Sequence, residues 1–242
     1  MIDYRLRVSP RARRLSLRVT LRGELEVVVP RRYNLARIPA VLEREQAWIR
    51  AALARAERRR QALPPPPAWQ IPAQIHLPAV GATWDVAVRD TGGASVRVGQ
   101  VGPHRLQLAG RVADEPACRQ ALGRWLVRQS RLHLVPRLES LGRTLGFPCT
   151  RTAVRLQRTR WGSCSSRGLI SLNARLLLLP AHLVEYVLVH ELCHTRELSH
   201  SRKFWRLVEQ HCPDHRQRRA ELRAAGRALP AWAADPRDQA YA

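Results

Sequence analysis

A short histidine motif in the last quarter of the chain constrains its local fold more than any other feature. His190 and His194 are four residues apart, and Glu191 directly follows the first histidine. Residues four apart on an α-helix lie one turn apart on the same face, so both imidazoles can reach one metal ion. This spacing with an intervening glutamate is typical of zinc hydrolases, in which the glutamate is the general base. The segment is therefore predicted to form a helix that holds zinc.

A third histidine, His200, constrains where this helix ends. In an unbroken helix it would lie about 15 Å along the axis from His190, too far to share a metal ion. If His200 is a ligand, the helix must end between His194 and His200, and Ser199 is predicted to cap the next helix. Three protein ligands leave the fourth zinc position for water, as in catalytic sites. The alternative third ligands are Glu197, which is the best of them, His211 and Glu209.

The residues around the motif extend the predicted chemistry. Glu191 is predicted to take a proton from a water activated by the ion and to pass it to the leaving group. Cys193 is predicted to be a small core residue that faces away from the metal. A nucleophilic role for Cys164 needs an activating histidine and is the less favoured interpretation. The segment 160–162 is either a turn with a packed tryptophan or a loop that meets the substrate.

The chain is strongly basic, which bears on its partners. Its 42 lysine and arginine residues against 19 acidic residues give a net charge of +23, and Lys203 is the single lysine. A coding bias explains why arginine is used in place of lysine. It explains less well why arginine exceeds aspartate and glutamate. Affinity for an anionic partner, such as nucleic acid or a nucleotide, is therefore predicted. The arginine runs lie at 11–14, 58–60 and 216–219.

The patterning of the chain predicts three segments. Residues 1–63 contain three alternating stretches, at 4–8, 15–19 and 25–29, followed by apolar residues at helical spacing from 34 to 61. A small antiparallel sheet and a helix are expected there. Residues 64–112 begin with a proline-rich linker at 64–67 and are strand-rich, which indicates a subdomain. Residues 113–242 are predicted to be a helical, metal-binding catalytic region.

Two features of the later segments give more specific expectations. Glycines at 92–93 between the alternating stretches 83–88 and 95–98 predict a hairpin. A long helix is expected from Asp114 to Leu145, with Pro116 in its first turn.

The sequence contains no apolar stretch long enough to span a membrane and no leader-like start, and its five cysteines form no C-x-x-C pair. A cytoplasmic location without membrane contact is therefore expected.

Several motifs together identify a family. They are Arg160-Trp161-Gly162-Ser163-Cys164, Leu172-Asn173-Ala174-Arg175-Leu176, Tyr186 to His194, His200-Ser201 and Phe204-Trp205. In these motifs the chain resembles the YgjP-like (DUF45) metallopeptidase-like family, which is distantly related to SprT-like and WLM proteins. The resemblance is dense over 154–213, looser over 4–49 and weakest over 64–112. This weak match implies that the strand-rich segment 64–112 is a divergent insertion or subdomain.

The resemblance implies an α+β fold with a zincin-like catalytic core. This core would be a small antiparallel sheet and an active-site helix, joined to an N-terminal antiparallel β unit and long helices. It also implies one catalytic Zn²⁺ on His190, His194 and His200, with Glu191 as the base. Metzincins carry glycine where this chain has Glu197, so analogy with that group is not used. The residues expected to meet substrate or support the ligands are Arg160, Trp161, Gly162, Ser163, Asn173 and Glu197.

Three functions are compatible with these features. The leading hypothesis is a zinc-dependent metallopeptidase that acts on a peptide or protein. The second is a metal-dependent nucleotide (pyro)phosphohydrolase, because the same metal and base can attack phosphorus and arginines crowd the sequence near the motif. The sequence has no phosphate-binding loop, which counts against it. The third is a nucleic-acid-associated, protease-like protein that binds through its arginine-rich surface.

Overall fold

A computed structural model describes residues 3–10, 12–20, 23–61, 69–148, 151–158 and 160–233, without the side chains of 59–61 and 227. Its internal contacts define one compact unit within Met1–Pro67 and a second within Ala68–Ala234. The division into three segments at 63/64 and 112/113 stays a prediction. The predicted linker at 64–67 lies outside the described residues.

The first unit contains a three-stranded sheet in the order β1-β3-β2, with bounds Tyr4–Val8, Ser16–Val19 and Leu25–Val29 for β1, β2 and β3. All three expected strands are present. The expected antiparallel pairing is right for β2 with β3 but wrong for β1, which pairs with β3 in parallel. The reason lies in burial: β3 is the most buried strand, and the central position covers it from both sides.

Helical residues cover the sheet of the first unit. A 3-10 turn at Leu35–Arg37 leads into α1 (Ile38–Arg44) and then α2 (Gln46–Gln61), so the single helix expected here is interrupted at Glu45. Ile38, Leu42 and Ile49 pack with the buried side chains of β3 into a small separate core.

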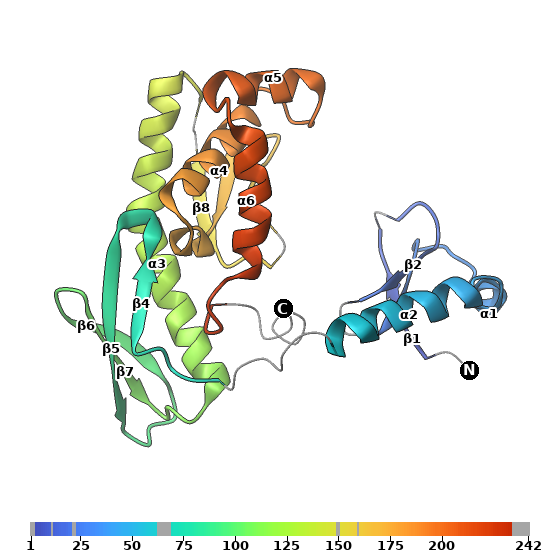
Figure 1. The fold of residues 1–242 in the computed structure, drawn as a ribbon, viewed down its shortest axis with the longest axis horizontal. Helices are drawn as coiled ribbons and strands as arrows, with labels where there is room; N and C mark the ends of the chain where they lie inside the picture. The colour runs from blue at the N-terminus through green and yellow to red at the C-terminus, as the bar shows by residue number, and fades with distance from the viewer. Residues whose placement is uncertain are drawn as a thin grey trace. The chain divides into compact units, whose positions relative to one another are not determined.

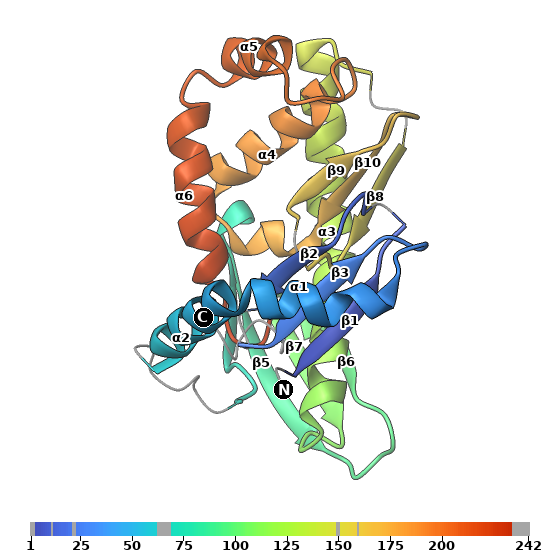
Figure 2. The same ribbon diagram turned by 90° about the vertical axis from the view of Figure 1, so that its right-hand side faces the viewer.

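The second unit is organised around α3 (Glu115–Leu145), which extends along its whole length (Figures 1 and 2). The helix begins and ends where the sequence predicts. The Asp114 carboxylate accepts a hydrogen bond from the backbone N–H of Ala117 at 2.9 Å, as an N-cap does. Gly146 ends the helix with a φ of 68°, a left-handed conformation that glycine adopts without steric cost.

Beside one half of α3 lies a four-stranded sheet in the order β4-β5-β7-β6. Its strands are β4 (Gln74–Leu77), β5 (Ala82–Asp90), β6 (Arg97–Gly102) and β7 (Arg105–Gly110). The hairpin expected between β5 and β6 is wrong, because β7 lies between them and pairs with β5 in parallel. The tight turn instead joins β6 to β7, where His104 has a φ of 52°.

A three-stranded sheet in the order β8-β10-β9 lies near the other half of α3. Its strands are β8 (Arg151–Arg155), β9 (Gly162–Cys164) and β10 (Leu169–Asn173). The segment expected to be only a tight loop therefore contains β9. The expected antiparallel sheet is in fact mixed, because β8 and β10 run in parallel while β9 is antiparallel to β10.

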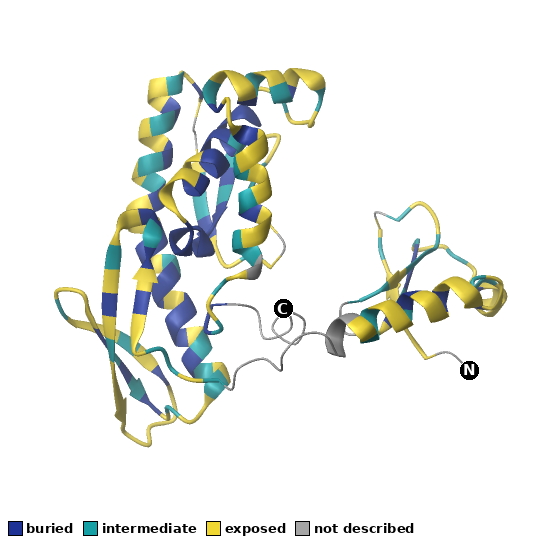
Figure 3. Ribbon diagram, viewed as in Figure 1, coloured by how far each residue is buried: buried dark blue, intermediate teal, exposed yellow. Residues whose placement is uncertain are grey.

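Three helices complete the second unit: α4 (Ala181–Cys193), α5 (Arg202–His211) and α6 (His215–Arg227). The α4 helix contacts β9 on one side and α6 on another (Figure 2). Figure 3 shows that buried residues concentrate on α4 and on the inner side of α3. The fold is thus α+β, as expected, with a small sheet beside the helix that carries the histidines.

One hydrophobic core joins all parts of the second unit. It includes Leu108 of β7, Trp125 of α3, Leu172 of β10, Leu188 of α4 and Phe204 of α5. The strands within 69–112 therefore pack on the same core as the helices that follow them. Within the described ranges, no helix is long and apolar enough to cross a membrane.

Candidate active site

The α4 helix positions the first two histidines of the motif. It begins after Pro180 and buries most of its surface, which fixes its axis against β9, α3 and α6. His190 lies in its last turn, and His194 is its C-cap residue. The two imidazoles point to one place, with ring centroids 4.9 Å apart.

The chain leaves the helix between His194 and His200, as the distance argument requires. The next helix, α5, is capped by Ser201, whose side chain accepts from the backbone N–H of Phe204 at 3.3 Å. The predicted cap, Ser199, is wrong by two residues. Its hydroxyl instead donates to Glu197 Oε1 at 2.7 Å, within the turn between the two helices.

This turn brings His200 back to the other two histidines. One candidate ligand atom from each of His190, His194 and His200 lies within 4.8 Å of the others. The Nε2 atoms of His190 and His200 are 3.2 Å apart. Two nitrogens of a tetrahedral zinc site, each at about 2.0–2.1 Å from the ion, are about 3.3 Å apart. The spacing of this pair therefore matches a tetrahedral metal site, and the third imidazole lies close enough to join it.

The Nδ1 atom of His194 is 2.9 Å from the backbone oxygen of Glu197. This hydrogen bond fixes the ring and leaves Nε2 free to bind a metal, a support that metal-binding histidines usually have. Glu197 therefore acts near the cluster through its carbonyl group, while its carboxylate faces Ser199.

The other alternative third ligands lie elsewhere. The His211 ring packs edge-on against Phe147, with centroids 5.1 Å apart. Glu209 lines a different groove, between α5 and α6. Among the residues that the structure describes, the group of three that could hold a metal consists of the three histidines.

Burial keeps His190 and His194 in the form that binds metal. It lowers the pKa of His190 to about 3, assisted by the nearby His194, His200 and Arg219. Burial also lowers the pKa of His194. Both rings are therefore neutral at physiological pH, with nitrogen lone pairs available to a metal ion.

Glu191 is buried beside the cluster with only 4% of its surface exposed. Burial raises the pKa of its carboxyl to about 8, against the opposing effect of the Arg160 charge. Its Oε2 atom has no hydrogen-bond partner among the described residues. A buried carboxylate in this state is costly unless a proton or ligand meets it, so Glu191 is suited to exchange protons near neutral pH.

Gly162 of β9 lies directly against Glu191. A Cβ atom at Gly162 would be 2.6 Å from Glu191 Oε1 and 2.7 Å from Cγ. Only glycine leaves room for the carboxylate here, which gives this strand its closest approach to α4.

The histidines and Glu191 line a cavity of about 630 Å³. Of the residues predicted to meet substrate, Arg160, Trp161, Gly162 and Ser163 all line it. Cys164 also lines it, at the end of β9. Cys193 is fully buried away from the lining, and burial raises its pKa to about 12, in keeping with a core thiol.

Asn173 supports the site from behind instead of lining it. Its side-chain N–H groups donate to the backbone oxygens of Gln157 and Arg160 at 2.9 and 2.8 Å, and its Oδ1 accepts from the N–H of Arg175. These bonds tie the segment before β9 to the end of β10. They position Arg160 and the residues that follow it.

Asn173→Ala is expected to destabilise the protein by about 1–2 kcal/mol, because the buried Asn173 side chain loses its hydrogen bonds to the backbone oxygens of Gln157 and Arg160. Activity should fall further than stability alone explains, since the segment carrying Arg160 loses its anchor. Thermal denaturation and steady-state kinetics measure both effects. Gln74→Ala, which removes an exposed side-chain hydrogen bond to Asp85, is the control and should change neither quantity appreciably.

Sequence reasoning missed several residues of the cavity wall. They are Tyr186, Val187, Leu198, Arg219, Leu222 and Arg223. Arg219 and Arg223 come from α6, which no spacing in the sequence connects to the histidine motif. Leu198 belongs to the turn before His200 and could have been inferred from that position alone.

The fold and the site together define a metallopeptidase domain. The chain belongs to the YgjP-like metallopeptidase family, whose domain model matches residues 13–225. No curated protein matches the chain. Among solved structures it is similar to the crystal structure of the metallopeptidase zymogen of Pyrococcus abyssi abylysin, with 27% identity over 36% of this chain and 89% of that chain. The TM-score of 0.33 is too low to inform the fold.

His200→Ala is expected to weaken metal binding by about 100-fold or more, because loss of a ligand costs more than loss of its hydrogen-bond support. His200 is exposed, so the stability of the metal-free protein should change by less than about 0.5 kcal/mol. Metal titration by calorimetry measures the affinity. His133→Ala, at an exposed histidine of α3, is the matched control. Equal affinity in the two variants would exclude His200 as a ligand.

Proposed function

We propose that this protein is a zinc-dependent peptidase that uses His190, His194 and His200 as metal ligands and Glu191 as general base. The observation that carries the proposal is the position of β9. This strand is at the edge of its sheet and lines the same cavity as the histidines and Glu191.

An edge strand offers a binding site for an extended peptide. The inner side of β9 pairs with β10, and in the described part of the chain no strand pairs with its outer side. Unpaired N–H and C=O groups of such an edge can add a peptide as a further strand. A peptide bound there would lie beside Glu191, whereas a nucleotide would gain nothing from a strand edge.

The chain's own groups account for the proton transfers. When bound by the three imidazoles, zinc supplies a Lewis acid that polarises a carbonyl group and makes water more acidic. Glu191 accepts a proton on the carboxylate and releases it to the departing amine, a role that its raised pKa favours. Arg160, which faces the cavity, can stabilise negative charge on the substrate as the bond breaks.

Metal analysis combined with an activity screen tests this function. The purified protein is expected to contain about one zinc per chain and to cleave members of a peptide library, and a chelator should stop the cleavage. Release of phosphate or pyrophosphate from nucleotides, dependent on Glu191 and without any peptide cleavage, would instead identify a nucleotide hydrolase.

A further inference from the structure

A second cavity, of about 810 Å³, lies between α5 and α6. Five arginines line it: Arg202, Arg206, Arg216, Arg219 and Arg223. We call this cavity the arginine groove. All five side chains are exposed, and none forms an ion pair with a carboxylate in the part of the chain that the structure describes. Glu209 is the one acidic residue in its lining, so the groove is strongly positive.

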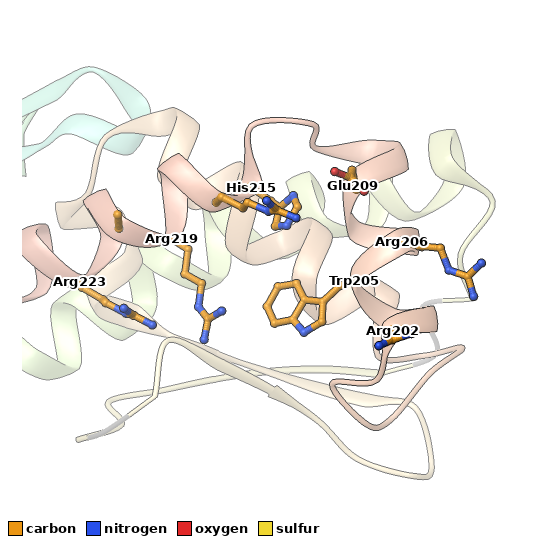
Figure 4. Close-up of a pocket in the computed structure, with 9 residues that line it drawn as sticks. Arg202, Trp205, Arg206, Glu209, His215, Arg219 and Arg223 are labelled. Carbon is orange, nitrogen blue, oxygen red and sulfur yellow. The ribbon is translucent and has the colours of Figure 1, made fainter.

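Helical spacing sets these arginines opposite one another. Arg202 and Arg206 lie one turn apart on α5, and Arg219 and Arg223 lie one turn apart on α6. Figure 4 shows Trp205 between these two pairs. The groove therefore presents guanidinium groups along both of its sides.

Ring contacts of Trp205 connect the groove to the histidine cluster. The Trp205 ring stacks on His200, with centroids 5.7 Å apart, and on His215 at the same distance. His215 lines the groove with only 5% of its surface exposed, and its Nδ1 atom has no partner among the described residues. A polar group this deeply buried without a partner favours a ligand in the groove.

The arginine groove also adjoins the cavity that holds the histidines. Arg219 and Arg223 line both. The Arg219 charge is close enough to His190 to contribute to the lowering of its pKa. A substrate polypeptide bound in the cavity with the histidines can therefore extend past these two arginines into the groove.

We propose that the arginine groove binds acidic side chains of the substrate, so that the enzyme prefers polypeptides with aspartate or glutamate beside the cleaved bond. This specificity rests on the proposed peptidase function. Guanidinium groups bind carboxylates by donating two parallel, charge-assisted hydrogen bonds. Five arginines that form no ion pair with the described residues can bind several carboxylates.

The lining of the groove favours an acidic peptide over single-stranded nucleic acid. Grooves for single strands combine positive charge with several aromatic rings on which bases stack. Trp205 is the one tryptophan, tyrosine or phenylalanine in the lining. Its ring already stacks on two histidines and lies under the Arg219 guanidinium, 4.9 Å from the ring centroid, which leaves little surface for a base.

Cleavage-site profiling tests the specificity. The zinc-loaded full chain is incubated with a proteome-derived peptide library, and a cleaved sequence is then synthesised with glutamate or with glutamine at the flanking positions. The glutamate peptide is expected to have a kcat/KM about three- to tenfold higher. Arg206→Gln/Arg216→Gln removes two of the five groove arginines and should lower this ratio, and an unchanged ratio would count against the groove as its source. Arg128→Gln/Arg131→Gln, which removes two exposed arginines of α3, should preserve it.

A binding measurement separates failure of the specificity from failure of the peptidase function. A fluorescent Glu-Ser repeat peptide is titrated into the Glu191→Gln full chain, with a Gln-Ser repeat peptide and a single-stranded oligonucleotide as competitors. If the protein cleaves the glutamate and glutamine forms of the peptide equally well, the proposed specificity is wrong and the peptidase function stands. If no peptide is cleaved but the Glu-Ser peptide binds through Arg206 and Arg216, the function fails and the groove keeps its acidic ligand. Displacement by the oligonucleotide alone would overturn the proposal.

Discussion

Glu191→Gln is expected to reduce peptide cleavage by about 10²- to 10⁴-fold, the usual contribution of a positioned general base. Glutamine has nearly the same shape as glutamate but cannot accept and release the proton. The three histidines remain in place, so metal content should be unchanged. Steady-state kinetics and metal analysis on the same preparation measure both quantities. A variant that lost zinc together with activity would indicate a structural role for Glu191.

The stability of the metal-free variant distinguishes lost chemistry from lost folding. Burial raises the pKa of Glu191 to about 8, from an ordinary value of 4.5. The stabilisation that this raised pKa represents is fully present below pH 4.5 and is lost as the pH rises toward 8. Glutamine carries no charge at any pH, so Glu191→Gln should exceed wild type in stability by about 4 kcal/mol at pH 8 and by less than about 1 kcal/mol at pH 5. Thermal denaturation in the presence of a chelator measures the difference, and a destabilised variant at pH 8 would contradict it.

Gly162→Ala is expected to disturb the same carboxylate from the side of β9. The added methyl group would be 2.6–2.8 Å from three atoms of Glu191, a side chain with only 4% of its surface exposed. Either β9 or the carboxylate must shift. The expected results are a loss of about 1–3 kcal/mol in stability, as in other overpacked cores, and a fall in kcat of about 100-fold from the misplaced base.

Gly99→Ala provides the matched control for this substitution. Gly99 also lies within a strand, β6, but a Cβ atom there would meet nothing within 4 Å. Its stability and activity should stay close to those of the wild type. If Gly162→Ala behaved like Gly99→Ala, the close approach of β9 to Glu191 would be wrong, and with it the edge-strand basis for peptide binding.

The features that depend on local geometry could be predicted from the sequence. The spacing of His190 and His194 requires one helical face, and the distance to His200 requires the helix to end before it. The capping aspartate and terminal glycine of α3 similarly follow from backbone chemistry within a few residues. Family membership also follows from local features, because the motifs that carry the resemblance lie between Arg160 and Trp205.

The features that depend on distant pairing could not be predicted. β9 has only three residues, Gly162–Cys164, and no alternation of apolar side chains, so its pairing with β10 decides that it is a strand. The order of the sheet in the first unit follows from the burial of β3, the most buried of its three strands, which local propensity does not reveal. The arginine groove arises because α5 and α6 face each other. In the sequence these arginines are indistinguishable from the many others.

Zinc-dependent cleavage of peptides is the most direct test of the proposed function. The purified protein is stripped of metal, assayed on a peptide library, and assayed again after one equivalent of zinc is restored, in parallel with His190→Ala. Cleavage should disappear on metal removal, return with zinc in the wild type and stay absent in His190→Ala. Cleavage that persists without metal, or that zinc restores equally in His190→Ala, would contradict a catalytic metal at the three histidines.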